Sequence, residues 1–316
     1  GGIQEDVYRY YFKAGSGRKW EISPPDRTDR EFGRRNQKVG SLLSNFSIFI
    51  SHFLFLIVSY PPLKITFLGS GTSSGVPMIG CDCEVCISSD KKDNRLRSSI
   101  LVQSAKTTLV VDAGPDFRYQ MLRQRIRRLD AVIFTHPHKD HMAGLDDIKA
   151  FNFLTKKPMK IYADSLTEEA LRRDFYYAFS DTKYPGIPEL DMNTIVQEPF
   201  VVGDIPIAPV LVWHLKMPVL GFRFGKFTYI TDANRIDDIE KEKIRGSEVL
   251  VLNALRIKKH ISHFTLGEAI EMVQELNVPR AYFTHISHQL GRHAEIEAGL
   301  PEGIHLAYDG LFLEFS

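Results

Sequence analysis

The feature that most constrains this chain is a dense group of metal-binding side chains in residues 135–141, which read Thr-His-Pro-His-Lys-Asp-His. The segment directly follows the apolar run Ala131–Phe134, which predicts a short buried strand. Because the chain turns at the end of a strand, neighbouring side chains there can converge on one point. Imidazole nitrogen and carboxylate oxygen suit Zn, Mn or Fe. The four residues of this group are His136, His138, Asp140 and His141. A surface loop with chance histidines is the alternative, and it is disfavoured by four such residues in six positions.

Three other apolar runs further along the chain end in the same kinds of side chain. These residues are His214 after Val212-Trp213, Asp232 after Tyr229-Ile230-Thr231, and His285 after Phe283-Thr284. Taken singly, His214 or His285 could be a core or surface histidine, and Asp232 could cap a helix. Their joint occurrence at strand ends favours one shared site.

Strand and helix patterns alternate from residue 64 onward. The runs that predict strands are Lys64–Leu68, Ser98–Val102, Thr107–Val111, Ala131–Phe134, Asp204–Trp213, Val219–Phe224, Phe227–Thr231, Glu248–Leu252 and Arg280–Thr284. The segments that predict helices are Asp116–Arg127, Asp146–Leu154, Ser165–Phe179, Ile236–Arg245 and Thr265–Leu276. Two strand-rich halves interleaved with helices predict an α/β protein with two sheets packed face to face and helices outside.

The pattern His-x-His-x-Asp-His, with Val111-Asp112-Ala113-Gly114 upstream, resembles the signature of the metallo-β-lactamase superfamily. The resemblance spans about residues 63–316 and implies an αββα four-layer sandwich, the metallo-β-lactamase fold, with a two-metal site at one edge. Carried over residue by residue, it implies one ion on His136, His138 and His214, a second on Asp140, His141 and His285, and Asp232 bridging both. It also implies that Asp112 orients the ligands from behind, with a plain turn-forming role as the alternative.

This resemblance implies hydrolytic chemistry. Two divalent ions about 3.5–4 Å apart would polarise a metal-bound hydroxide and clamp a phosphoryl or carbonyl group. Asp140 and Asp232 would then be catalytic as well as metal-ligating. The residues do not choose between Mn and Zn, because imidazole and carboxylate accept both.

All three cysteines lie in one loop, Cys81-Asp82-Cys83-Glu84-Val85-Cys86. An odd, clustered set is a poor disulfide framework and indicates reduced thiols or metal ligands in a reducing compartment. The loop and the His285-x-x-His288 pair resemble the phosphoribosyl 1,2-cyclic phosphate phosphodiesterases of the carbon–phosphorus lyase pathway. That resemblance implies a structural zinc on Cys81, Cys83, Cys86 and His288, beside the active site. Three thiols without a metal are the alternative.

One more histidine, His263, precedes the helix predicted at Thr265–Leu276. In the phosphodiesterases that the chain resembles, a histidine at this place serves as general acid or base, which implies that His263 protonates the leaving alkoxide. A loop histidine bonded to backbone is the alternative, and His260 is a weaker competitor. Arg95 and Arg97 could meet a substrate phosphate, but a solvated face is the favoured interpretation.

Residues 1–62 differ from the rest in composition. They hold nine basic and six acidic side chains of the chain's 40 and 39, and residues 1–41 show no sustained apolar period, which predicts disorder. Residues 42–60 contain no Asp, Glu, Lys or Arg and have the length of a borderline transmembrane helix. We expect residues 1–62 to be a disordered or non-native extension and residues 63–316 to be the catalytic domain. A membrane anchor at 42–60 is the alternative.

These observations predict a cytoplasmic, dinuclear metal-dependent phosphodiesterase for a cyclic or small phosphodiester. The slightly acidic balance of residues 63–316 argues against nucleic acid as a partner. A membrane partner is expected only if 42–60 is an anchor, and a homodimer stays open. The rivals of the same fold are a tRNA 3′-processing endonuclease and a thioester or lactone hydrolase. The rival of another class is a non-catalytic metal-binding protein.

Overall fold

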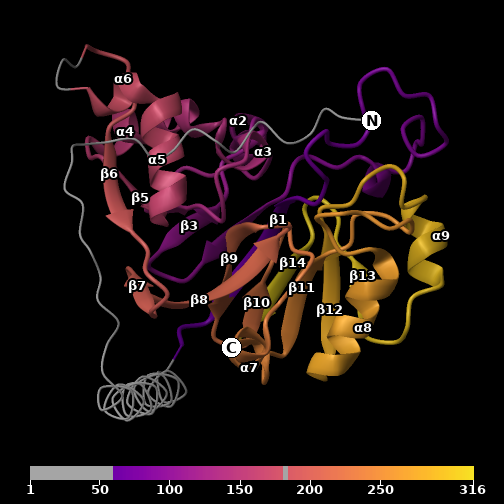
Figure 1. The fold of residues 1–316 in the computed structure, drawn as a ribbon. Coiled ribbons are helices and arrows are strands. Elements are labelled where there is room, and N and C mark those ends of the chain that lie inside the picture. The colour runs from indigo at the N-terminus through magenta and orange to yellow at the C-terminus, as the bar shows by residue number, and fades with distance from the viewer. Residues whose placement is uncertain (1–59, 181–183) are drawn as a thin grey trace, which may run out of the picture. The chain divides into compact units, whose positions relative to one another are not determined.

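Two seven-stranded mixed sheets form the centre of the computed structural model, which describes residues 60–180 and 184–316 (Figure 1). The first sheet has the order β14 (Phe312–Phe315), β1 (Leu63–Gly69), β2 (Ser99–Gln103), β3 (Thr108–Val111), β4 (Ala131–Ile133), β5 (Met159–Ala163) and β6 (Leu190–Thr194). The second has the order β13 (Ile304–Leu306), β12 (Arg280–Thr284), β11 (Val249–Asn253), β10 (Phe227–Tyr229), β9 (Met217–Phe224), β8 (Ile205–His214) and β7 (Phe200–Val202). Strands β3 to β6 are parallel, as are β10 to β13.

Helices cover the outer faces of both sheets (Figure 1). The helical elements of the first half are η1 (Lys91–Asp93), α2 (Phe117–Arg123), α3 (Lys139–Met142), η2 (Leu145–Ile148), α4 (Lys149–Thr155), α5 (Ser165–Asp174) and α6 (Tyr176–Phe179). Those of the second half are α7 (Asp238–Ile244), α8 (Leu266–Leu276) and α9 (His293–Ala298). The predicted αββα sandwich is therefore confirmed.

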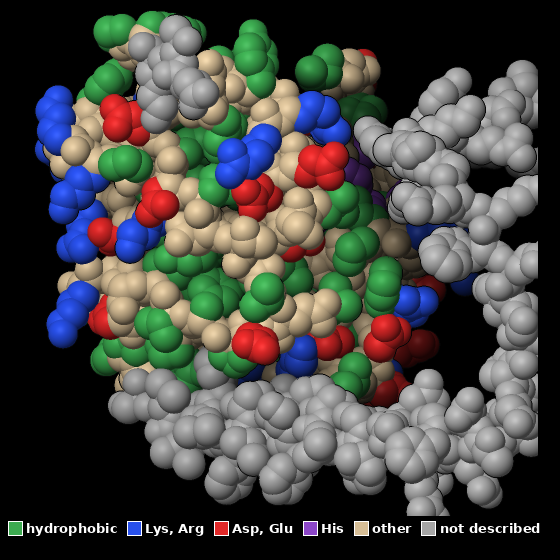
Figure 2. All heavy atoms as spheres, turned by 60° about the vertical axis from the view of Figure 1, so that its left-hand side comes forward, with side chains coloured by type: hydrophobic (Ala, Val, Ile, Leu, Met, Phe, Trp, Pro, Cys, Tyr) green, Lys and Arg blue, Asp and Glu red, His purple; other side chains and the backbone are tan. Residues whose placement is uncertain are grey.

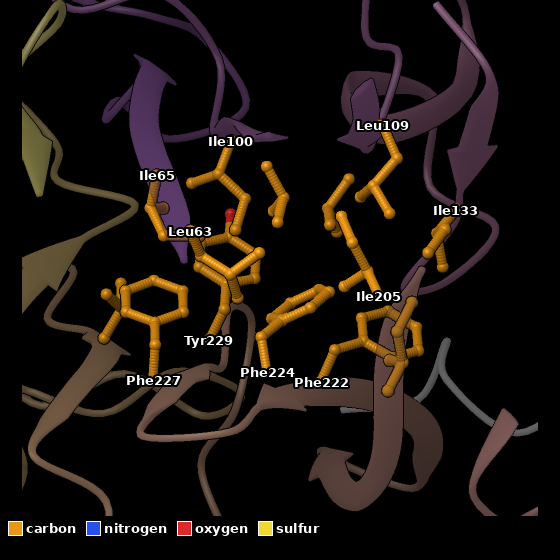
Figure 3. Close-up of a cluster of buried hydrophobic side chains, with 14 of the residues drawn as sticks. Leu63, Ile65, Ile100, Leu109, Ile133, Ile205, Phe222, Phe224, Phe227 and Tyr229 are labelled. Carbon is orange, nitrogen blue, oxygen red and sulfur yellow. The ribbon is translucent and has the colours of Figure 1, made fainter. Parts of the chain in front are cut away.

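The alternation of side chains along the strands divides the core into three layers. In β11, Val249 and Val251 face the other sheet, whereas Leu250 and Leu252 face the helical side with α8. Figure 3 shows the layer between the sheets, where side chains from the two sheets point toward one another. Those labelled are Leu63, Ile65, Ile100, Leu109 and Ile133 from the first sheet and Ile205, Phe222, Phe224, Phe227 and Tyr229 from the second. This apolar layer holds the two sheets together and so sets where the ends of their strands lie.

The main differences from the predicted elements concern helix ends and short strands. The helix expected over residues 165–179 is two helices, because Phe175 leaves helical backbone at φ −117° and ψ 38°. The helix expected to reach residue 127 ends at Arg123, and Arg125 adopts a positive φ of 53°. Strands β5, β6, β7, β13 and β14 and helix α9 were not predicted. They are three to six residues long, too short to show a clear period.

Strand β1 begins at Leu63. The predicted disorder of residues 1–41 and the anchor considered at 42–60 lie outside the described residues, apart from Tyr60, so the division at residue 62 stays a prediction. Among the described residues, no helix is both long and apolar enough to cross a membrane.

Candidate metal centre and cysteine cluster

Strand ends bring the predicted His and Asp ligands to one edge of the sandwich. Strand β10 runs parallel to β11 and β11 to β12, while β9 is antiparallel to both β8 and β10, so β8, β10 and β12 all end on the same side. His214 ends β8, whereas Asp232 and His285 follow β10 and β12. One ligand atom from each of Asp140, His141, Asp232 and His285 lies within 4.8 Å of the others.

Three more histidine rings extend this group. The ring centroid of His136 lies 4.2 Å from that of His141 and 4.7 Å from that of His138, and the His138 and His214 centroids are 5.1 Å apart. We call the seven side chains the His/Asp cluster: His136, His138, Asp140, His141, His214, Asp232 and His285. His138 is exposed, whereas His136 and His141 are fully buried, so His138 marks the solvent side.

Several rings are held at the nitrogen that faces away from the cluster. The pairs are His141 Nδ1 with Asp112 Oδ2 at 2.8 Å, His214 Nδ1 with the carbonyl of Ser262 at 2.8 Å, and His136 Nδ1 with Thr135 Oγ1 at 2.9 Å. A hydrogen bond at one ring nitrogen fixes the tautomer and leaves the lone pair of the other nitrogen for a metal. These three rings are therefore arranged as metal ligands would be.

The nitrogens that face the cluster are buried without hydrogen-bond partners. Within the described residues, His136 Nε2, His141 Nε2 and His285 Nδ1 form no hydrogen bond. His141 Nε2 nevertheless lies 3.1 Å from an Asp140 oxygen and 3.2 Å from an Asp232 oxygen. Buried polar atoms are rarely left unpaired, because each costs about 1–3 kcal/mol. Unpaired nitrogens beside two carboxylates fit divalent cations.

Burial and charge set the protonation states of the cluster. Burial lowers the pKa of His285 to about 3 and the pKa of His136 well below its usual range, which keeps both rings neutral. Burial also disfavours charge on His141, but the surrounding carboxylates outweigh it and raise the pKa of that ring. The nearby histidines lower the pKa of Asp140 and Asp232 despite their burial. Metal binding requires ionised carboxylates and neutral imidazoles, so an ion at this site would take the place of the proton on His141.

The backbone of the site is unusual at three non-glycine residues. Asp112, Asp232 and His285 have φ values of 66°, 56° and 54°, a left-handed region that is uncommon for non-glycine residues. Gly114 lets the Asp112 turn pack directly on the ligand loop, since a Cβ there would lie 2.0 Å from the carbonyl oxygen of Asp140. Asp112 is buried and accepts hydrogen bonds from the amide and hydroxyl of Thr135. This is the geometry of an orienting carboxylate.

His263 lies at the margin of the His/Asp cluster. Its Nε2 is 3.0 Å from Asp232 Oδ1, and its Nδ1 is 3.1 Å from His260 Nδ1. One of these two facing Nδ1 atoms must carry a proton for them to bond. Together with His214 and Asp232, His263 also forms a group of metal-ligand spacing. The contact with His260 depends on the fold of the loop. The sequence therefore makes His260 only the weaker candidate for the general acid or base.

The cysteine loop forms a separate cluster. Cys81 Sγ and Cys83 Sγ each lie 3.3 Å from His288 Nδ1, and with Cys86 the four ligand atoms lie within 4.8 Å of one another. We call these four residues the cysteine cluster. A tetrahedral zinc with Zn–S bonds of about 2.3 Å holds its sulfur ligands roughly 3.8 Å apart. That separation lies within the 4.8 Å limit of the four ligand atoms. The hydrogen bond from His288 lowers the pKa of Cys83 to about 6, which favours the thiolate.

The prediction of a solvated face for Arg95 is wrong. This side chain is only 4% exposed, and its guanidinium donates to Ser70 Oγ at 2.9 Å and to His293 Nδ1 at 3.0 Å. Arg97 is half-buried and pairs with Asp116 at 3.0 Å. Arg95, through Ser70, and Arg97, which also donates to the carbonyl of Ser73 at 3.0 Å, hold the first residues of the loop that carries the cysteines.

Comparison with known proteins gives the family. Residues 107–286 match the β-lactamase superfamily domain. The chain belongs to the metallo-β-lactamase superfamily. A solved structure described as a new diphosphatase from the PhnP family is 42% identical, has a TM-score of 0.75, and aligns over 80% of this chain and 98% of that one. PhnP is the phosphoribosyl cyclic phosphate phosphodiesterase, so the predicted resemblance is confirmed.

Two further relatives differ in what they show. An octanoyltransferase of Porphyromonas gingivalis is 37% identical over 252 residues, which are 79% of this chain and 51% of that protein. The chain spans about half the length of the curated relatives it matches, among them this octanoyltransferase. The short form of human tRNase Z is 18% identical, with a TM-score of 0.58 over 79% of this chain and 98% of that one, and shows the fold alone. Membership of the family and likeness to the PhnP-family diphosphatase support a hydrolytic enzyme.

Proposed function

We propose that the chain is a dinuclear metal-dependent phosphodiesterase for a cyclic or otherwise small phosphodiester. The observation that carries this proposal is the convergence of the His/Asp cluster, with buried ring nitrogens that lack partners beside carboxylates. One ion would be held by His136, His138 and His214, the other by Asp140, His141 and His285, with Asp232 shared. Such ions, when bound, activate water and neutralise the charge on the phosphoryl oxygens.

His263 is the proposed proton donor. Its Nε2 points into the cluster, 3.0 Å from Asp232. In hydrolysis the oxygen of water gives up one proton to solvent and forms the new bond to phosphorus, and the bond from phosphorus to the leaving oxygen breaks. The leaving oxygen can take its proton from His263 Nε2, while Nδ1 of the same ring contacts His260.

The proposal includes one structural zinc on the cysteine cluster. Three thiolates and one imidazole close a tetrahedron and leave no position for water, so this ion would not deliver a nucleophile. Reduced thiols also suit a cytoplasmic location. A homodimer stays a prediction.

The rival functions have weaker support. The likeness to tRNase Z supports the fold only, and the face seen in Figure 2 carries basic and acidic side chains interspersed rather than one broad basic surface for a polyanion. The name octanoyltransferase belongs to a protein of which the chain spans about half. A thioester or lactone hydrolase would use the same cluster. A non-catalytic metal-binding protein would not need His263 to point toward the His/Asp cluster.

Turnover by the purified protein, supplied with Mn or Zn, tests the proposal. We expect hydrolysis of bis(p-nitrophenyl) phosphate and of a ribose cyclic phosphate, and much slower turnover of a thioester or a lactone. Preference for the thioester or the lactone would contradict the proposal, as would full metal loading without turnover of any ester.

The role of His263 has its own test. The variant His263→Ala should lose far more rate on a ribose cyclic phosphate than on bis(p-nitrophenyl) phosphate, because p-nitrophenolate leaves without a proton. Equal losses on both substrates, with less bound metal, would instead make His263 a ligand.

A further inference from the structure

Strand β11 lies between β10 and β12, the two strands that lead into Asp232 and His285, yet none of the seven side chains of the His/Asp cluster comes from it. It ends at Asn253, which is fully buried and lies opposite Thr284 of β12. The next residue, Ala254, donates its amide to the carbonyl of Thr284 at 3.0 Å. The backbone at the end of β11 therefore holds the strand that leads into His285.

The side chain of Asn253 holds the neighbour on the other side. Where β10 ends, the amide of Ile230 donates to the carbonyl of Val251 at 2.9 Å. Further along, Asn253 Oδ1 accepts from the amide of Ala233 at 2.7 Å, and Asn253 Nδ2 donates to the carbonyl of the same residue at 2.9 Å. A side-chain amide offers a donor and an acceptor, as a peptide group does. Asn253 thus continues the pairing of β11 with the chain beyond the end of β10.

The residue that Asn253 holds directly follows Asp232. Asp232 has a φ of 56°, a conformation that is uncommon for non-glycine residues and persists where the surrounding structure holds it. Its Oδ2 lies 3.2 Å from His141 Nε2 and 3.1 Å from His285 Nδ1. Because the bonds to Ala233 fix the backbone on one side of Asp232, they also fix the direction of its carboxylate.

The Ala233 carbonyl also anchors the loop that carries His263. It accepts a second hydrogen bond, from the amide of Phe264 at 2.8 Å. The preceding residue, His263, places its Nε2 3.0 Å from Asp232 Oδ1. One carbonyl oxygen, held by Asn253, therefore connects the proposed shared metal ligand with the proposed proton donor.

We propose that Asn253 is a positioning residue, whose side chain holds Ala233 so that the Asp232 carboxylate is shared between two ions and stays beside His263. This inference rests on the proposed function, since it takes Asp232 to bridge two ions. Asn253 acts through the backbone and is not itself a ligand. Alanine at this position would offer neither donor nor acceptor, and an ionised aspartate would offer acceptors only.

Manganese binding followed by electron paramagnetic resonance tests this role, because the spectrum reports free Mn and shows whether two bound ions are magnetically coupled. Mn suits the His/Asp cluster, whereas the thiolates of the cysteine cluster favour zinc. We expect the unmodified protein to bind two Mn ions as a coupled pair. In Asn253→Ala at least one ion should bind about 10- to 100-fold more weakly. The coupled signal and the rate on bis(p-nitrophenyl) phosphate should then appear only at higher Mn concentration.

Asn152 on α4 offers a matched control. It is only 6% exposed, and its side chain likewise pairs with both the amide and the carbonyl of one residue, Glu189, at 3.0 Å each. Asn152→Ala should lower stability in denaturant titrations but keep the affinity for Mn and the coupled signal. Asn253→Asp retains the volume and loses the amide donor, so it covers the case in which Asn253→Ala does not fold. It should also bind Mn more weakly.

Unchanged Mn affinity and coupling in the Asn253 variants would overturn the positioning role. An equal weakening in Asn152→Ala would also overturn it, since the effect would then follow from general loss of stability. A coupled Mn pair without hydrolysis of any phosphodiester would contradict the proposed function alone. Absence of the pair from the unmodified protein would overturn both.

Discussion

The His/Asp cluster and the cysteine cluster are built in different ways. The first draws its side chains from several strand ends and is mostly buried, and its rings are braced by Asp112, Thr135 and the Ser262 carbonyl. The second uses one half-buried loop and a single histidine. Hard and borderline ligands with a solvent side suit catalysis, whereas three thiolates suit a closed structural zinc. The comparison teaches that hydrogen bonds to the ligand rings themselves, more than ligand number, distinguish the two sites.

Among the variants considered, Asp232→Ala should cause the largest loss of turnover. Asp232 touches His141, His263 and His285, so its loss removes a shared carboxylate from the whole cluster. We expect hydrolysis of bis(p-nitrophenyl) phosphate to fall at least about 1,000-fold, because even residues behind the ligands cost about 10- to 100-fold. Elemental analysis should show metal lost from the His/Asp cluster and one zinc retained. The matched control is Asp238→Ala, an exposed carboxylate on α7, and normal turnover by Asp232→Ala would contradict the account.

A smaller effect should follow Asp112→Asn. The change keeps the shape of the side chain but removes the carboxylate that accepts the Nδ1 proton of His141 at 2.8 Å. The ring can then adopt the wrong tautomer, so turnover or metal affinity should fall about 10- to 100-fold. Rescue by a higher Mn or Zn concentration would support an orienting role. An unchanged rate and affinity would mean that Asp112 only forms the turn.

The cysteine cluster should respond to Cys83→Ser mainly in stability. A weaker fourth ligand loosens the loop, so the melting temperature should fall and the Cys-bound zinc should leave. Turnover should fall less than about tenfold, well below the effect of a lost catalytic ligand. Calorimetry and zinc release measure the two parts. Full stability with three freely titrating thiols would show that no zinc is held there.

The effect furthest from catalysis is the pH dependence of stability at His293, which lies behind the cysteine loop. Burial, with the charge of Arg95, lowers the pKa of His293 from 6.5 to about 4. Between these values the unfolded chain binds a proton that the folded protein does not, so stability falls as the pH drops from about 6.5 to about 4, by up to about 3 kcal/mol. His293→Gln should flatten this part of the curve in denaturant titrations. An unchanged slope in His293→Gln would remove the assignment.

The sequence alone was sufficient to predict the sandwich and to bring the ligand residues to one edge, because each lies directly after an apolar strand. The grouping of Cys81, Cys83, Cys86 and His288 was implied by the family resemblance, and the structure brings these four side chains together. The burial of Arg95 was missed, since its partners Ser70 and His293 are far away in the chain. The left-handed backbone conformation of Asp232 and His285 could not be predicted from the sequence either, because only tertiary packing sustains it. The contact of His260 with His263 depends in the same way on a folded loop.

Stepwise chelation with metal analysis tests the central claim most directly, which is that the chain holds two chemically different metal sites and that only the His/Asp cluster is catalytic. The account predicts that a mild chelator abolishes phosphodiesterase activity while one zinc per chain remains bound. Added Mn or Zn should then restore the rate without changing that retained zinc. If activity instead falls in step with loss of the thiolate-bound zinc, or persists after the His/Asp cluster has been stripped, the account is contradicted.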